Sequence, residues 1–245
     1  CRTAYWMTGD TYLAKQAALA FARSINDEGL TASRWPSRVP QIIPLWSLHW
    51  ILTLSEYDFY SGDHATTTTC LPAVDRVLDW FLDKCAEDGL IHNIPYWMFA
   101  DWSPDWPMGI PPGAGKKPSA LVHFILIAAL KAAASLQRSH AHHREADDYT
   151  CTAEHLSRFA RNAFFSPPHT IFRDTPEQDA PASRLANAWA ILADVTDPGE
   201  ASALAGTIAR GTGMTQEALF GTFFIFDAMM KAGRPDLAEQ TLQDY

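Results

Sequence analysis

Two kinds of helical segment alternate along this chain of 245 residues. The first kind carries an apolar stripe on one side and charged residues on the other, which is typical of a helix with one face in water. The second kind is apolar almost all the way round, and such a helix must be buried on every side. Strict alternation of the two kinds therefore predicts an all-α fold in which helical hairpins form an inner and an outer layer.

The two kinds of segment can be placed along the chain. Amphipathic helices are predicted at 11–24, 68–86, 145–164, 200–209 and 235–245. Apolar helices are predicted at 44–60, 119–136, 217–231 and, with a weaker pattern, 182–194. Residues 1–7 resemble the last turns of a further inner helix. The segments add up to about four and a half hairpins, so we expect residues 1–245 to form one toroidal domain that is a section of a larger ring.

The connections between the segments are of two lengths. Short turns such as Thr8-Gly9-Asp10 and Ser61-Gly62-Asp63 put Gly at the end of one helix and Asp near the start of the next, as helix capping requires. The other connections are long, at 25–43, 87–118 and 165–181. Two of them open with matching residues, Asp27-Glu28-Gly29-Leu30 and Glu87-Asp88-Gly89-Leu90. This recurrence indicates an internal repeat, and we expect the long loops to lie together at the functional end.

Composition and charge argue against several classes of partner. The formal net charge is -9 and the largest basic cluster is Lys116-Lys117, so no nucleic acid is expected. No apolar run reaches about 18 residues, so no membrane partner is expected either. The four cysteines show no Cys-x-x-Cys spacing. His140, His142 and His143 lie in a short polar turn where we expect them to be exposed, so neither a metal nor a cofactor is predicted.

The location of the protein cannot be read from the sequence. The first residue is Cys1, and no signal peptide is visible. We expect the natural N-terminus to have been removed or to lie upstream, and the sequence favours neither a secreted nor a cytoplasmic location.

The most informative stretch is the loop at 91–106, which contains three Trp, one Tyr, one Phe and two Asp. Flat aromatic rings stack on the apolar faces of sugars, and carboxylates hold hydroxyl groups or transfer protons. The loop thus predicts a carbohydrate site with five candidate residues: Trp97, Asp101, Trp102, Asp105 and Trp106. The alternative is that the aromatic residues fill the core and that Asp101 caps a neighbouring element.

Three further residues are candidates for the same site. Arg34 and Trp35, in the first long loop, could bind hydroxyl groups and stack on a sugar ring, respectively. Trp50, near the start of an apolar helix, could line the site. The alternative for Arg34 is an ion pair that joins two loops, and the alternative for Trp50 is the core.

Several motifs together resemble a known enzyme family. In order, they are Arg-Thr-Ala-Tyr-Trp-Met-Thr-Gly-Asp, Asp-Glu-Gly-Leu-Thr-Ala-Ser-Arg-Trp-Pro-Ser, Ile-Pro-Leu-Trp-Ser-Leu-His-Trp-Ile, Tyr-Ser-Gly-Asp, Glu-Asp-Gly-Leu-Ile and Trp-Met-Phe-Ala-Asp-Trp. They resemble the catalytic domain of bacterial and fungal α-L-rhamnosidases, best over residues 1–135. The resemblance implies an inverting glycoside hydrolase on an (α/α)6 barrel that acts on terminal α-L-rhamnosyl or similar glycosides.

The same resemblance implies that the catalytic groups lie elsewhere in the parent protein. The family's general acid falls upstream of residue 1, and its general base, a Glu, falls beyond residue 245. We therefore expect this chain alone to be inactive, to need flanking segments of the parent chain, and to keep Asp101 as its best catalytic candidate. Two alternatives stay open. Another (α/α)6 enzyme, a uronyl hydrolase or a glucosidase, would make Asp101 or Asp105 catalytic, and a non-catalytic module would bind a sugar without cleaving it.

Overall fold

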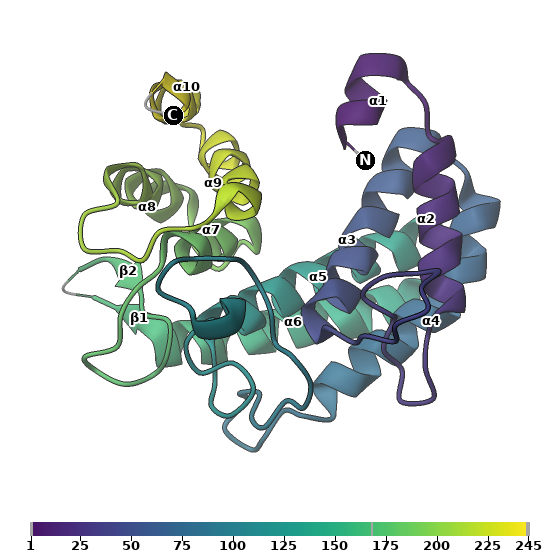
Figure 1. Cartoon of the computed structure of the whole chain (residues 1–245), viewed down its shortest axis with the longest axis horizontal. Helices are drawn as coiled ribbons and strands as arrows, with labels where there is room; N and C mark the ends of the chain where they lie inside the picture. The colour runs from purple at the N-terminus through teal and green to yellow at the C-terminus, as the bar shows by residue number, and fades with distance from the viewer. Residues whose placement is uncertain (1, 168, 244–245) are drawn as a thin grey trace. The chain divides into compact units, whose positions relative to one another are not determined.

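The structure, a computed structural model, describes residues 2–167 and 169–243 and has ten α-helices in that part (Figure 1). Its two strands, β1 (Phe165–Ser166) and β2 (Ile171–Phe172), form one antiparallel pair. The prediction of an all-α chain is therefore confirmed. The loop expected at 165–181 contains this small hairpin.

The ten helices follow the predicted segments to within a few residues. They are α1 (Arg2–Thr8), α2 (Tyr12–Arg23), α3 (Pro44–Ser61), α4 (His64–Leu82), α5 (Ala120–Ser139), α6 (His143–Phe164), α7 (Arg184–Leu192), α8 (Pro198–Arg210), α9 (Leu219–Lys231) and α10 (Pro235–Gln243). A short 3-10 helix, η1 (Pro107–Gly109), lies in the long loop before α5. The chain divides into two compact units, and the boundary between them falls within α5 and α6.

The first unit comprises residues 1–85 and 128–154, and in it α2, α3 and α4 pack against one another. Pro44 begins α3, and Gly62, with φ 62°, ends it in the left-handed conformation. The next residue, Asp63, caps α4 by accepting a hydrogen bond from the Thr66 backbone N–H. Its carboxylate also accepts hydrogen bonds from Lys15 of α2 and Tyr57 of α3. One predicted Gly-Asp turn therefore joins three helices.

The second unit comprises residues 86–127 and 155–245. Here α7 pairs with α8 and α9 pairs with α10, and the two hairpins stack so that α7 contacts α9 and α8 contacts α10. Asp197 and Glu200 form a capping box at the start of α8. Within this unit the helices thus form two layers, as the alternation of segments predicts.

The helix α5 is buried along its apolar run, since every residue from 121 to 130 is shielded from solvent. By length and hydropathy alone, α5 could cross a membrane. However, 83% of its most apolar window is buried inside the protein, which fits a core helix.

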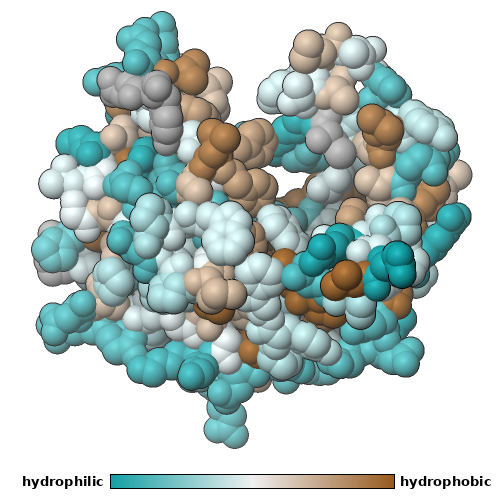
Figure 2. All heavy atoms as spheres, in the orientation of Figure 1, coloured by the Kyte–Doolittle hydropathy of each residue, from teal (hydrophilic) through white to brown (hydrophobic). Residues whose placement is uncertain are grey.

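The expectation that every apolar helix is buried all round is wrong for α9. Ile225 and Met229 are fully buried on one side, but Leu219 is 85% exposed and Phe223 and Met230 also reach solvent. Figure 2 shows hydrophobic side chains gathered over this helix. Hydrophobic periodicity reports the residues of a helix but not its neighbours, and α9 packs on α7, α8 and α10 through only part of its surface.

The expected exposure of the histidine turn is wrong for one of its three members. His142 and His143 are exposed, whereas the side chain of His140 is only 7% exposed. Its ring lies inward because the Thr68 hydroxyl offers Nδ1 a hydrogen bond at 3.1 Å.

The two copies of the Gly-Leu motif form the same turn, which confirms the internal repeat. In the first copy the Asn26 N–H donates to the Leu30 carbonyl, and in the second the Ala86 N–H donates to the Leu90 carbonyl, both at 2.9 Å. Gly29 and Gly89 both have positive φ, at 107° and 72°.

We expect Gly29→Ala to destabilise the protein more than Gly62→Ala does. Both glycines have positive φ, where Ala costs about 1–2 kcal/mol. A Cβ on Gly29 would also lie 2.7 Å from the Arg76 carbonyl oxygen, whereas a Cβ on Gly62 would meet nothing within 4 Å. Overpacking adds about 1–3 kcal/mol. Urea unfolding of both variants measures the difference, and equal losses would contradict the close approach.

Candidate functional site

Three aromatic rings of the 91–106 loop lie together in the second unit. Trp97, Phe99 and Trp102 have ring centroids 5.1 Å (Trp97–Phe99), 6.1 Å (Trp97–Trp102) and 4.9 Å (Phe99–Trp102) apart, with tilted planes. Phe99 is buried, Trp97 is half-buried, and Trp102 is 60% exposed. We call these three residues the aromatic cluster. It presents a large flat ring to solvent on top of a packed base.

Hydrogen bonds to the backbone fix the loop that carries the aromatic cluster. The Trp97 indole N–H donates to the Met108 carbonyl at 2.9 Å, and the Ala100 N–H donates to the Gly109 carbonyl at 2.9 Å. Gly109 has a φ of 69°, and a Cβ there would lie 2.5 Å from the Phe99 ring. Only glycine therefore allows η1 to lie this close to Phe99.

A buried histidine holds the start of the loop. The Ile91 N–H donates to His123 Nε2 at 2.8 Å, and His123 Nδ1 lies 2.7 Å from the Ser119 carbonyl. These contacts require a neutral ring with its proton on Nδ1. Burial agrees with this, because it lowers the pKa of His123 to about 4.

Asp101 is 1% exposed, and its carboxylate faces the start of α9. One oxygen accepts the Trp102 N–H at 2.9 Å, and the other accepts the Ala218 N–H at 2.6 Å. A Cβ on Gly221 would lie 2.6 Å from the same oxygen, so the glycine makes room for the carboxylate. Burial raises the pKa of Asp101, while the N–H donors of Ala218, Trp102 and Gly221 act in the opposite direction.

A second set of polar groups lies beside this contact. Ser103 donates a hydrogen bond to the Gln216 carbonyl, and Arg184 donates one to the Gln216 side chain at 2.8 Å. Arg184 also forms a buried ion pair with Glu217 at 3.1 Å. Because a buried pair is costly to break, these contacts hold the 211–218 segment against α7.

Asp174 is a buried carboxyl that sequence reasoning missed. It lies after β2, where Oδ1 accepts hydrogen bonds from the Ser183 backbone and hydroxyl at 3.1 and 2.6 Å. Its Oδ2 is buried and has no hydrogen-bond partner among the described residues. Burial raises the pKa of Asp174 to about 6. The backbone carbonyl of Asp174 accepts the Ala120 N–H at 2.9 Å. Lys117 forms an ion pair with Glu177 at 2.7 Å, so the long loops at 87–118 and 165–181 do meet.

The sequence-predicted residues fall into two groups by exposure. Trp102, Asp105, Arg34 and Trp35 are exposed, and Trp97 is half-buried. Asp101, Trp106 and Trp50 are buried, and the Trp50 indole donates to the Ala18 carbonyl at 3.1 Å. Arg34, Trp35 and Trp50 belong to the first unit, and the other five belong to the second. Burial favours packing roles for Trp50 and Trp106, and sugar contact by any of the eight stays a prediction.

Three charged residues of the second unit were absent from the sequence-based candidates: Asp174, Arg184 and Glu217. Glu217 comes directly before the apolar run of α9, and a charged residue there is a signal for a helix start. Arg184 and Asp174 carry no comparable local signal. Among the described residues, one group of three metal-ligating side chains is close enough to hold an ion, and it lies in the first unit.

Asp174 gives a pH prediction with a definite sign. Its folded pKa is raised, so the unfolded chain ionises first as pH rises from about 4 to 6, and stability falls over that range. One pKa unit corresponds to about 1.4 kcal/mol, so a shift from about 4 to about 6 lowers the free energy of unfolding by roughly 2–3 kcal/mol. We expect the unfolding free energy of wild type minus that of Asp174→Asn to fall by this amount between pH 4 and 7. A difference that stays constant would show that Asp174 titrates normally.

Comparison with known proteins agrees with the observed fold. The family model described as the bacterial alpha-L-rhamnosidase 6 hairpin glycosidase domain matches residues 1–245. A GH78 family rhamnosidase of Bacillus sp. GL1 superposes with a TM-score of 0.85 at 22% identity, over 98% of this chain and 25% of that one. A rhamnosidase from Klebsiella oxytoca with rhamnose bound superposes with a TM-score of 0.82 at 18% identity, over 97% of this chain and 45% of that one. An α-L-rhamnosidase from Aspergillus terreus superposes with a TM-score of 0.71 at 16% identity, over 94% of this chain and 27% of that one.

These similarities have different weight. At such identities the solved structures show a shared fold alone, and the chain spans a quarter to just under half of the length of the first two. Comparison with curated proteins found no match. The family model covers the whole chain, however, and its six-hairpin description agrees with the predicted (α/α)6 class. The chain therefore belongs to the family of bacterial α-L-rhamnosidase six-hairpin glycosidase domains.

Proposed function

We propose that the chain forms part of an enzyme that hydrolyses terminal α-L-rhamnosyl bonds with inversion at the sugar carbon. The observation that carries this proposal is the family match over residues 1–245, together with an exposed Trp102 on a rigid loop. The structural neighbour with rhamnose bound supports the choice of sugar.

The aromatic cluster provides the surface for the sugar. Rhamnose is a deoxysugar with a methyl group, so one side of its ring is distinctly apolar. Trp102 packs against Phe99 and Trp97 at centroid distances of 4.9 and 6.1 Å, which limit the orientations open to its ring. A ring that is already oriented loses little conformational entropy when a sugar stacks on it. Asp105, exposed on the same loop, would accept hydrogen bonds from sugar hydroxyls in this proposal.

Asp101 acts in this proposal by holding Trp102 in place. Its carboxylate accepts the Trp102 backbone N–H and fastens the loop to the start of α9. The sequence-based alternatives, a uronyl hydrolase or a glucosidase, require a catalytic Asp101 or Asp105. Asp101 is 1% exposed and accepts two backbone N–H groups, so it is poorly suited to transfer protons to a substrate.

The buried carboxylates of the second unit also bear on the acid and the base. An inverting glycosidase needs two carboxyl groups about 6.5–9.5 Å apart with a water molecule between them. Asp101, Asp174 and Glu217 are all buried and bind backbone groups, Ser183 or Arg184. These contacts argue against each of the three carboxylates as the acid or the base. They support an acid and a base that come from parts of the parent protein outside residues 1–245.

We expect the isolated chain to show no turnover of an aryl α-L-rhamnoside, because loss of an acid or a base each costs about 10² to 10⁴ in rate. The parent protein is the positive control. Turnover by the purified chain at the parent's rate would contradict this assignment. Loss of that turnover in Asp105→Asn would then place a catalytic group in the loop.

We expect Trp102→Ala to weaken binding of L-rhamnose without lowering the melting temperature. Loss of one stacking ring is worth about 0.5–1.5 kcal/mol, or up to roughly tenfold in Kd. Trp6→Ala is the matched control, because Trp6 is 66% exposed and lies on α1. Calorimetric titration of the parent protein measures both variants. Equal affinities in both would remove Trp102 from the site.

Asp101→Asn should lower both sugar affinity and stability. An Asn in this position has one carbonyl oxygen for two N–H donors, so a buried donor loses its partner at about 1–3 kcal/mol. A melting temperature equal to that of wild type, with affinity lost, would instead show direct contact between Asp101 and the sugar.

A further inference from the structure

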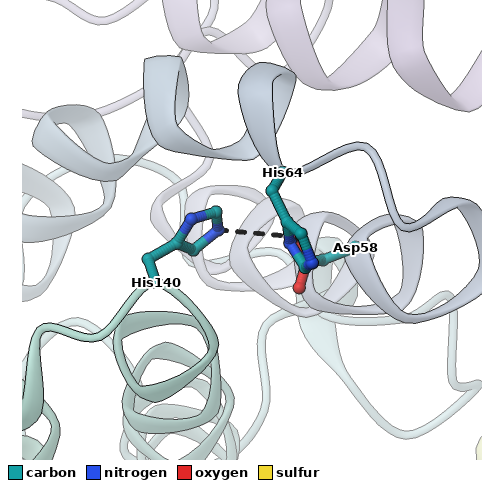
Figure 3. A group of neighbouring side chains, drawn as sticks. All are labelled: Asp58, His64 and His140. Atoms are coloured by element: carbon teal, nitrogen blue, oxygen red, sulfur yellow. Dashed lines mark hydrogen bonds and ion pairs between the residues drawn. The ribbon is translucent and has the colours of Figure 1, made fainter.

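Three side chains with metal-binding chemistry converge in the first unit (Figure 3). Asp58 lies near the end of α3, His64 begins α4, and His140 follows the last residue of α5. Their ligand atoms all lie within 4.8 Å of one another. Asp58 Oδ1 is 3.1 Å from His64 Nδ1 and 3.6 Å from His140 Nε2.

Neighbouring hydrogen bonds fix the proton of the His140 ring. The Thr68 hydroxyl donates to the His64 carbonyl at 2.8 Å, so its proton is already used. His140 Nδ1 lies 3.1 Å from the same hydroxyl oxygen, and with the Thr68 proton directed at the His64 carbonyl we assign Nδ1 as the donor of that bond. In a neutral ring the other nitrogen, Nε2, then carries a lone pair. Figure 3 shows this ring directed at Asp58 and His64.

This arrangement leaves His140 Nε2 without a partner. The side chain is 7% exposed, and within the described part of the chain Nε2 is buried without a hydrogen bond. A lone pair that faces a carboxylate oxygen at 3.6 Å is repelled by it. A cation between the two atoms would turn the repulsion into two attractive contacts.

We propose that Asp58, His64 and His140 bind one divalent transition-metal ion, with Zn²⁺ as the ion that fits this ligand set. Two imidazole nitrogens and one carboxylate oxygen are ligands that zinc accepts, at about 2.0–2.2 Å. Tetrahedral ligands at that distance lie about 3.3 Å from one another. Two of the three pairs are already at 3.1 and 3.6 Å, so two of the three ligand separations are close to this spacing.

Neighbouring side chains orient two of the three proposed ligands. The Ser139 hydroxyl shares its one proton between Asp58 Oδ2 at 3.1 Å and the Leu136 carbonyl at 2.9 Å, so its contact favours the orientation that leaves Asp58 Oδ1 toward the histidines. Thr68 orients His140 through Nδ1. Metal-ligating histidines and carboxylates commonly have such outer partners. The site would connect the end of α3, the start of α4 and the end of α5, so we assign it a structural role.

The test is titration of Zn²⁺ into the whole chain by calorimetry. We expect one ion per wild-type chain and a melting temperature that rises with Zn²⁺, because ligands that bind the native state stabilise it. His64→Ala should weaken binding by at least about tenfold, as loss of a metal contact does. His64 has a side chain that is 58% exposed, so this variant should keep the fold. His140→Ala should lose binding to the same degree.

His143→Ala is the matched control, because His143 is an exposed neighbour outside the group of three. It should bind Zn²⁺ as wild type does. Wild type that takes up no Zn²⁺ would overturn the proposal. His64→Ala that binds as tightly as wild type would also overturn it, because the ion would then sit on other histidines.

Discussion

The contact between Asp101 and the first turn of α9 organises the second unit. A helix begins with N–H groups that have no partner inside the helix, and its dipole favours a negative charge there. The N-cap residue of α9 is Ala218, which has no side-chain acceptor of its own. Asp101 supplies that acceptor across 117 residues of sequence. Gly221 permits the approach because it has no Cβ in the way of the carboxylate.

Several features of the candidate site depend on this contact. The same carboxylate accepts the Trp102 N–H, so the exposed ring of the aromatic cluster and the start of α9 are fastened at one point. Ser103 and Gln216 form a second bond alongside it. The stable hairpins of α7 to α10 can thus hold a loop with little regular structure, which is how rigid scaffolds commonly present binding residues.

The sequence was a good guide where the deciding forces are local. Amphipathic and apolar stripes predicted the helices to within a few residues, and the two Gly-Leu motifs do form the same turn. It was a poor guide to what covers each helix. The pattern of α9 is apolar all round, yet Leu219 is exposed, because burial depends on neighbours that periodicity does not specify. His140 turned inward for a similar reason, since Thr68 is distant in sequence.

The site shows the same division between local and distant information. The dense aromatic and acidic residues of the 91–106 loop marked it as unusual, and capping by Asp101 was one of the two interpretations the residues allowed. Its target could not be read, because a carboxylate in a loop gives no sign of which helix start it will meet. Asp174 was missed because its raised pKa comes from burial, which only the packed structure creates.

Amide hydrogen exchange at Ala218 tests the central contact most directly. Ala218 precedes the first residue of α9 and donates to Asp101 at 2.6 Å. We expect its N–H to exchange as slowly as the amides inside α9, and to exchange faster in Asp101→Asn. Exchange in the wild type at the rate of an unprotected amide would show that Asp101 does not hold the start of α9.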